Sequence, residues 1–547
     1  MKIRVNKILK KFVFVSVIIF VSQSVPAQIT QQEIDEKLQN LPFPSFSIQV
    51  PTFRNKTYSI LDFGAMGNGM AMNTKAINDA ITKCSKEGGG HVIIPPGLFI
   101  TGQITMKSNV DLHCETGAMI VFSSNIDDYP LVQNGSGYII EPLINGANLE
   151  NVAITGDGSF DGNGQYWRPV KKEKLNDRQW KMLLAKGGAL NDKGNTWFPS
   201  QAAADGQNYL SSKKRSELTL SDYEKVKPFL RPKMLNLSNS KNVMIEGITL
   251  KNSPEFAMNM RNIDGLALKN VTVMNEWWAQ NGDGLDLSSC RNVLIYNCTV
   301  NAGDDGICMK SSGNNPDVFS LENIVIKDCK VYHAHGGFVT GSNTDGNMRN
   351  IFVNNCVFTW SDTGLRFKSN IGKGGKVENV FVDGIYMKDI DGEAIIFDLK
   401  YEDAAAVKNV DFQILGSKVP NFNNISIKNV VCDGAKSAFL VDGSKIPMVS
   451  NVTVDNVIFK TEKGISSTLA DKLTFKNCTF DCKTTPFVDL IQTSNVTFQN
   501  CVFPQTAGTM MQLSGANTKN ISIEKSNITQ QQITIGDGVD ANTVVIK

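Results

Sequence analysis

The segment Asn292-Val293-Leu294-Ile295 is one copy of a pattern that recurs along most of this 547-residue chain, an Asn followed by a short run rich in apolar residues. Other copies begin at Asn242, Asn323, Asn350, Asn379, Asn424, Asn451, Asn495 and Asn520. The typical spacing, about 21 to 31 residues, fits one coil of a parallel β-helix. Leucine-rich repeats would need a leucine skeleton and helices, and propeller blades would need longer repeats. We therefore expect an all-β fold, a single right-handed parallel β-helix.

The ends of such a solenoid expose unpaired strand edges and must be capped. Within residues 73–84, positions 76, 77, 80 and 81 are apolar, which is the pattern of one helical face. This segment precedes a predicted strand over residues 91–95. We expect it to form a short N-terminal capping helix.

The repeat is interrupted at about residues 165–232, a segment rich in Lys, Arg and Glu. It contains a predicted helix over residues 177–185, which we expect Trp180, Leu183 and Leu184 to anchor. The partly helical insertion is either a surface addition packed on the solenoid or a lid or wall at one end of a groove. The sequence leaves both interpretations open.

The first 27 residues have the layout of a secretory signal peptide. A basic start is followed by an apolar core over residues 12–21 and by the small-residue cleavage site Val25-Pro26-Ala27. The apolar run is too short for a transmembrane helix to be the preferred interpretation. We expect export to the periplasm or the medium, a leader over residues 28–57, and one β-helix domain over residues 58–547.

Eleven cysteines in an exported chain would ordinarily suggest disulfides. Five of them recur at equivalent repeat positions, each after Asn or Asp: Cys298, Cys329, Cys356, Cys478 and Cys501. We expect these to be buried, small apolar residues in a stacked ladder, and the odd total argues against complete pairing. No Cys/His spacing matches a zinc site, so we expect no metal and no cofactor.

Four short motifs carry residue types that chemistry on an acidic sugar requires. They are Asn281-Gly282-Asp283-Gly284-Leu285-Asp286, Gly303-Asp304-Asp305-Gly306, His335-Gly336-Gly337 and Arg366-Phe367-Lys368. About 21, 31 and 31 residues separate Asp283, Asp304, His335 and Arg366, close to the repeat period. Since stacked strands lie about 4.8 Å apart, we expect these side chains to form one column on one face.

Glycosidic bond hydrolysis needs a proton for the leaving oxygen and an activated water, which carboxyl groups can supply. Asp283, Asp304 and Asp305 are three candidates, and crowding of like charges raises the pKa of at least one of them. Neighbours on a strand point to opposite faces, so Asp304 and Asp305 can act together only if the backbone bends between Gly303 and Gly306. Turn formation or calcium binding would be alternative uses of these aspartates.

The basic residues extend the prediction to an anionic substrate. His335, in register with the aspartates, would orient and tune the acid, although a single histidine is more often a packing residue. Arg366 and Lys368 are two apart and would share one face of a strand, where a planar fork and a point charge suit a sugar carboxylate. Surface salt bridges are the alternative for these two residues. The combination predicts a uronate rather than a neutral sugar.

These motifs resemble those of the polygalacturonases, glycoside hydrolase family 28, whose pattern is Asn-Thr-Asp, Gly-Asp-Asp, Gly-His-Gly and Arg-x-Lys on a right-handed β-helix. The segment over residues 156–164, with Trp167, and Asn252-Ser253-Pro254 also resemble that family. The similarity runs from about Tyr58 to past Lys428. Gly282 stands where the family has Thr, and Ala334 where it has the first Gly.

The resemblance implies a role for each residue. Asp304 would be the general acid, Asp283 and Asp305 would activate water with inversion of configuration, and His335 would support the acid. Arg366 and Lys368, with Asn281, would bind substrate.

The run from His335 to Ser342 looks most like the bacterial exo-acting members. The expected activity is hydrolysis of α-1,4 galacturonosyl linkages in pectic polysaccharide from non-reducing ends. A rhamnogalacturonan hydrolase is the alternative on the same scaffold, a calcium-dependent pectate lyase a less favoured one, and a non-catalytic carbohydrate-binding β-helix a third. The net charge of +2 does not indicate nucleic-acid or membrane binding, and we expect a monomer.

Overall fold

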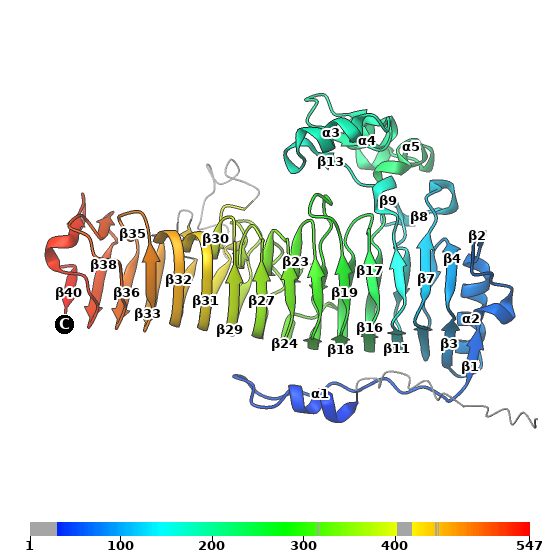
Figure 1. Ribbon diagram of the computed structural model, residues 1–547, viewed down its shortest axis with the longest axis horizontal. Helices are drawn as coiled ribbons and strands as arrows, with labels where there is room; N and C mark the ends of the chain where they lie inside the picture. The colour runs from blue at the N-terminus through cyan, green and yellow to red at the C-terminus, as the bar shows by residue number, and fades with distance from the viewer. Residues whose placement is uncertain (1–29, 314–316, 402–417, 444–445, 447) are drawn as a thin grey trace, which may run out of the picture.

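The computed structural model describes residues 30–313, 317–401, 418–443, 446 and 448–547, so the predicted signal peptide lies outside the described residues. One sheet system of 35 strands runs from β1 (Thr57–Ser59) to β40 (Val544–Ile546), and its strands pair in parallel with those of neighbouring coils. The predicted right-handed parallel β-helix is confirmed, and Figure 1 shows its coils succeeding one another along the long axis.

The middle coils place three rows of strands around a common core. The row that carries the site contains β20 (Leu285–Ser288), β23 (Asp305–Lys310), β26 (Gly336–Thr340), β28 (Leu365–Lys368) and β30 (Glu393–Asp398). The second row includes β21 (Arg291–Tyr296) and β24 (Leu321–Lys327), and the third includes β22 (Thr299–Asn301) and β25 (Lys330–Tyr332). Longer strands span two or more rows: β16 (Leu235–Glu246), β18 (Met258–Lys269), β27 (Met348–Thr359), β29 (Lys376–Lys388), β31 (Asn421–Asp442) and β32 (Val449–Thr468).

Strands of the two ends complete the solenoid. The N-terminal coils contain β2 (Asn68–Met72), β3 (Gly90–Ile94), β4 (Gly97–Thr101), β5 (Ile104–Thr105), β6 (Val110–Cys114), β7 (Ala118–Phe122), β10 (Ile144–Ala147), β11 (Glu150–Gly156), β12 (Ser159–Asp161), β17 (Thr249–Lys251) and β19 (Thr272–Met274). The C-terminal coils contain β33 (Ala470–Lys476), β34 (Thr479–Cys482), β35 (Val488–Ile491), β36 (Ser494–Gln499), β37 (Met511–Ser514), β38 (Lys519–Glu524) and β39 (Ile533–Ile535). A separate hairpin pairs β8 (Leu131–Asn134) with β9 (Gly137–Ile140).

The recurring Asn of the sequence pattern stacks as a ladder along one corner. Asn292, Asn323, Asn350 and Asn379 have left-handed backbone conformations, which Asn tolerates better than most residues. The amides of Asn323, Asn350 and Asn379 each donate to the Asn of the preceding coil, at 3.0, 3.1 and 3.2 Å, and Asn292 donates to Asp264 at 2.8 Å. The Asn thus makes the turn and ties neighbouring coils together.

Inside the coils, apolar side chains of equivalent positions stack in the same manner. The rings of Phe367 and Phe397 lie parallel with centroids 4.6 Å apart. All eleven cysteines are buried free thiols, so the predicted role of the five repeat cysteines is confirmed. No helix among the described residues is both long enough and apolar enough to span a membrane.

Two helices cover the solenoid outside its coils. Helix α2 (Thr74–Lys86) packs Ile77, Ala80 and Ile81 into the first coils, which confirms the predicted cap. Helix α1 (Gln31–Lys37) belongs to the leader, which lies along the outside of the strands (Figure 1). There Ile34 contacts an outward-facing apolar stripe that includes Met244 and Leu294.

The insertion forms a small layer above one part of the solenoid (Figure 1). It contains a three-stranded sheet of β13 (Val170–Lys171), β15 (Thr196–Phe198) and β14 (Ala189–Leu190), and the helices α3 (Asp177–Leu184), α4 (Gln201–Ser211) and α5 (Leu220–Lys225). The predicted helix is confirmed, and Trp180 is buried with Leu183 beside it. The prediction for Leu184 is wrong: it is 38% exposed, because it lies next to Leu183 and points away from the small core.

Candidate active site

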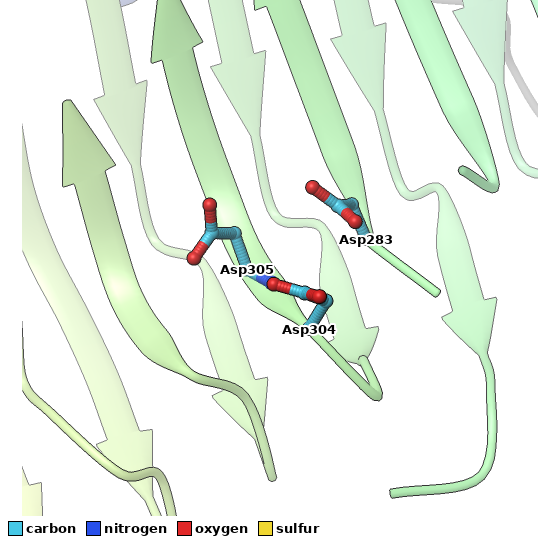
Figure 2. Close-up of side chains that lie close together, drawn as sticks. All are labelled: Asp283, Asp304 and Asp305. Atoms are coloured by element: carbon cyan, nitrogen blue, oxygen red, sulfur yellow. The ribbon is translucent and has the colours of Figure 1, made fainter. Parts of the chain in front are cut away.

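The three aspartates of the motifs meet where β20 and β23 begin. Asp283 lies two residues before β20 and Asp305 is the first residue of β23; the Gly284 amide donates to the Asp305 carbonyl at 2.9 Å. One carboxylate oxygen of each of Asp283, Asp304 and Asp305 lies within 4.8 Å of the others. Figure 2 shows these three side chains gathered over the ends of the two strands. The expectation that they form one cluster is confirmed.

Glycines permit the bend that lets Asp304 and Asp305 act together. The chain bends at Gly303 and Asp304 before β23 begins. A Cβ at Gly303 would lie 2.3 Å from the Ala279 carbonyl oxygen, and one at Gly306 would lie 2.6 Å from Cγ1 of Val331. Neither position has room for a side chain, which explains why the pair is bordered by glycine.

His335 lies directly beside Asp304 in the next coil, as its spacing predicts. Its backbone amide donates to the Asp304 carbonyl at 2.8 Å, and its Nδ1 is 3.0 Å from Asp304 Oδ1. On the other side of the ring, Nε2 is 3.0 Å from Lys174 Nζ and 3.6 Å from Asp362 Oδ2. Since an ammonium can only donate, the Lys174 contact makes Nε2 the acceptor and leaves the proton on Nδ1, facing Asp304.

Arg366 and Lys368 face the site but do not continue that column, so the prediction of a single column is wrong for them. Arg366 is in register with Val339, four residues beyond His335 along the chain. The coil between β26 and β28 has only 27 residues, as the pairing of Phe338 with Leu365 shows, so a spacing of 31 overshoots. The predicted shared face is correct, because both cations lie beside the Tyr401 ring, at 5.2 and 4.7 Å from its centroid.

Burial and neighbouring charge disfavour the ionised form of Asp283. Burial, and then the nearby Asp286 carboxylate, raise the pKa of Asp283 well above its ordinary value. Lys310 opposes this effect: its Nζ is 3.3 Å from Asp283 Oδ2, and it makes a shorter ion pair with Asp286. These neighbours together favour the protonated form of Asp283.

Asp305 has the opposite setting. Burial would raise the pKa of its carboxyl, but the charges of Lys368 and Lys310 outweigh burial and lower it. Lys368 Nζ donates to Asp305 Oδ2 at 2.6 Å, and both side chains are almost fully enclosed. Among the described residues no donor contacts Oδ1 of Asp283 or Oδ1 of Asp305, and both oxygens are buried.

The donor set fits a divalent cation poorly. Three carboxylates could in principle supply oxygen ligands. However, Lys310 and Lys368 already place ammonium groups against Asp283 and Asp305. A calcium ion would compete with both of these built-in cations, and the charge of the cluster is already partly compensated. The geometry therefore favours acid–base chemistry over a calcium-dependent reaction.

The insertion contacts the loop that leads to the site. Leu175 and Trp180 pack with Trp278, which belongs to the loop that leads to Asp283. Arg168 pairs with Glu276 of the same loop. Arg231, at the end of the insertion, donates to Asn281 Oδ1 at 2.9 Å, so Asn281 is held by protein. These contacts fit both interpretations of the insertion, a surface addition packed on the solenoid and a wall beside the site.

Several residues at the site had no predicted role. Asp286 stands within a quoted motif, and Lys310 follows Asp305 by five residues, but only the register between β20 and β23 shows that they pair. Asp398 pairs with Arg366 at 2.9 Å across 32 residues. Lys174 lies in a segment without repeat register, so no pattern in the sequence could place it beside His335.

Comparison with known proteins agrees with the fold and the site. The chain is 26% identical over 352 residues to a probable polygalacturonase of Vitis vinifera, covering 61% of each chain. It is 27% identical over 391 residues to an exo-poly-alpha-D-galacturonosidase of Dickeya chrysanthemi, covering 69% of this chain and 62% of that protein. The matches thus span about three fifths of the length of these relatives.

Solved structures show the same architecture. The crystal structure of a hyperthermoactive exopolygalacturonase from Thermotoga maritima superposes with a TM-score of 0.64 at 27% identity, covering 82% of this chain and 96% of that chain. A family 28 exopolygalacturonase of Yersinia enterocolitica, at 22% identity and a TM-score of 0.61, supports the fold alone. The sequence model of glycosyl hydrolases family 28 matches residues 178–482, more than half of the chain and all four motifs, and the chain therefore belongs to glycosyl hydrolases family 28.

Proposed function

We propose that the protein hydrolyses α-1,4 galacturonosyl linkages in pectic polysaccharide, releasing galacturonate from non-reducing ends. The observation that carries this proposal is the cluster of Asp283, Asp304 and Asp305, surrounded by lysines and an arginine at one site. Carboxyl groups supply the acid–base chemistry of glycoside hydrolysis, and the cations suit a substrate with a carboxylate on each ring. The polygalacturonases among its relatives agree with that substrate class.

In the proposed mechanism Asp304 gives its proton to the glycosidic oxygen as the C1–O bond breaks. Its side chain is 17% exposed, more open than those of Asp283 and Asp305, and it receives the Nδ1–H of His335 on Oδ1. Asp283 and Asp305 together hold and activate a water, whose proton passes to this pair as the water attacks C1. Because Asp283 favours its protonated form and Asp305 its ionised form, the pair shares protons, and Asp305 is the member whose ionisation activity requires.

We propose inversion at C1, with the water attacking from the face opposite the leaving oxygen. Three carboxyl groups allow two to position the water while the third protonates the leaving group. Their closest oxygens lie within 4.8 Å of one another, shorter than the carboxyl separation of about 6.5 to 9.5 Å usual for inverting enzymes with two carboxyl groups. Stereochemistry is therefore the part of the mechanism that most needs a direct test.

The insertion wall supports exo action. It is tied to the loop that precedes Asp283, on the N-terminal side of the aspartate cluster, through Trp278 and Glu276. A wall there would stop a polysaccharide from extending past the site in that direction, so only a chain end would fit. A rhamnogalacturonan chain is the second candidate substrate, since the same carboxylates would act on it. The N-terminal 27 residues support export to the periplasm or medium.

A proton NMR time course of trigalacturonate digestion tests the proposal. We expect galacturonate to appear first as the β-anomer, because inversion of an α-linkage gives β, before mutarotation mixes the anomers. Early α-anomer would contradict inversion while retaining hydrolysis. No cleavage of trigalacturonate or polygalacturonate, with cleavage of rhamnogalacturonan fragments, would favour the second candidate.

A further inference from the structure

The two cations that the sequence assigns to the substrate carboxylate are already engaged within the protein. Lys368 Nζ donates to the buried Asp305, and Arg366 Nη2 is 2.9 Å from Asp398 Oδ2. An incoming carboxylate would have to compete with both of these ion pairs. If these residues alone bound the sugar carboxylate, that carboxylate would partly neutralise Lys368, whose charge lowers the pKa of Asp305.

Lys174 of the insertion is differently placed. It ends the 3-10 turn η4 (Lys172–Lys174), and its Nζ is 3.0 Å from His335 Nε2. Within the described residues, no carboxylate lies within ion-pair distance of this ammonium. The Oδ2 atom of Asp362 lies 3.6 Å from the same His335 nitrogen. Lys174 thus presents a cation at the catalytic centre without a carboxylate partner.

The surroundings of Lys174 hold it in this place. Its Nζ lies 5.7 Å from the centroid of the Trp277 ring, and Trp277 is 40% exposed, so part of the ring stays open to a ligand. The next residue in each segment, Leu175 or Trp278, is partly buried and packs against the small core of the insertion. The backbone on both sides is therefore fixed while Lys174 and Trp277 face the site. An ammonium beside an open aromatic face suits a sugar ring that carries a carboxylate.

We propose that Lys174 is a specificity-determining residue that binds the carboxylate of the sugar ring next to the scissile bond. This inference rests on the proposed function, and it assigns the anion recognition to the insertion rather than to the solenoid. When substrate enters, Lys174 exchanges its hydrogen bond to the neutral His335 nitrogen for a charge-assisted one to the carboxylate, at little cost to the rest of the site. The Trp277 face then covers the apolar side of the same ring.

Steady-state kinetics on two matched substrates test the inference: trigalacturonate and its methyl ester, in which each carboxylate is neutral. In the wild type we expect a clear preference for the acid. In Lys174→Met we expect kcat/KM for the acid to fall about 10- to 100-fold, as for loss of one charge-assisted hydrogen bond, and kcat/KM for the ester to change little. Lys174→Arg should retain most of the preference. Lys172→Met, an exposed lysine of the same turn, is the matched control and should behave as wild type.

Each other result overturns the inference. An equal loss on acid and ester would show that Lys174 acts only by positioning His335, and an unchanged ratio with unchanged rates would show that it contacts no substrate. Failure of the wild type to cleave either substrate would refute the proposed function itself. That failure is distinguishable because it appears before any substitution is made.

Discussion

The buried carboxylate of Asp283 lowers the stability of the folded protein. Burial and the Asp286 carboxylate disfavour its charge, and Lys310 compensates only in part. Its folded-state pKa is raised, so the ionised form destabilises the fold. This cost is absent below the ordinary pKa of an aspartate, where both folded and unfolded chains are protonated. It grows as pH rises from that value to the raised one, because there only the unfolded chain ionises, and it is constant at higher pH.

We therefore predict that Asp283→Asn stabilises the protein while removing activity. At pH 8 the melting temperature should rise by about 1 to 3 °C, because a neutral isostere replaces a disfavoured charge. The gain should disappear near pH 3.5. The rate should fall by about 10²- to 10⁴-fold, the usual effect of removing a general base. Calorimetry at the two pH values checks the first part, and a lower melting temperature at pH 8 would contradict it.

Lys368 should control the acid limb of the pH–rate profile. Its charge helps to lower the pKa of Asp305, which must be ionised to take a proton from water. Lys368→Met should raise that pKa, so activity should be lost at a higher pH on acidification than in the wild type. Lys368→Arg keeps the charge and should shift the limb less. A profile of kcat/KM against pH that is merely lowered, without displacement, would show that the role assigned to Lys368 is wrong.

At the scale of elements, the insertion has a small apolar core of its own, which packs against Trp278 of the solenoid. Val170, Trp180 and Trp197 form the small core, with Trp278 of the solenoid packed against it. Since the coils do not depend on this core, the wall can be loosened without unfolding the catalytic row of strands.

We predict that Trp180→Ala changes the products more than the stability. A buried Trp→Ala substitution costs about 3 to 5 kcal/mol, here confined to the insertion. Loosening the wall should let longer chains pass the site, so digests of polygalacturonate should contain oligomers as well as the monomer. The main thermal transition should hardly move. Leu184→Ala, on the exposed side of the same helix, is the control and should leave products unchanged. A digest of Trp180→Ala that still contains monomer alone would argue against the wall.

The sequence predicts the repeated elements well, because the same physical constraint recurs in each coil. Local conformation and packing determine three kinds of position: the Asn at each corner, the apolar interior positions and the glycines around Asp305. Contacts that depend on the varying length of the coils cannot be predicted from the repeat pattern. By residue count Arg366 is in phase with His335, yet a shorter coil places Asp362 there instead. Lys174 reaches the site from a segment without periodicity, where only the tertiary structure shows its neighbours.

At the scale of the whole molecule, the β-helix is held together by stacked apolar residues rather than by disulfides. All eleven cysteines are buried as free thiols, and burial raises the pKa of several of them, including Cys114 and Cys290. Buried thiols with raised pKa values are poor nucleophiles. The solenoid therefore tolerates an oxidising compartment without forming crosslinks.

We predict that a thiol reagent such as Ellman's reagent labels essentially no cysteine in the native protein and all eleven after denaturation without reductant. The melting temperature should be the same with and without a reducing agent, because no disulfide constrains the unfolded chain. Fewer than eleven reactive thiols in the denatured, unreduced protein would reveal disulfides and contradict this account of the core.

The central claim is that Asp304 protonates the leaving oxygen of a galacturonosyl linkage at a non-reducing chain end. Chromatography of polygalacturonate digests, with a chelator present, tests it most directly when wild type and Asp304→Asn are compared. We predict that saturated galacturonate monomer is the first product of the wild type and that the variant releases at least 10²-fold less. Unsaturated products, or undiminished release by the Asp304→Asn variant, would contradict the claim.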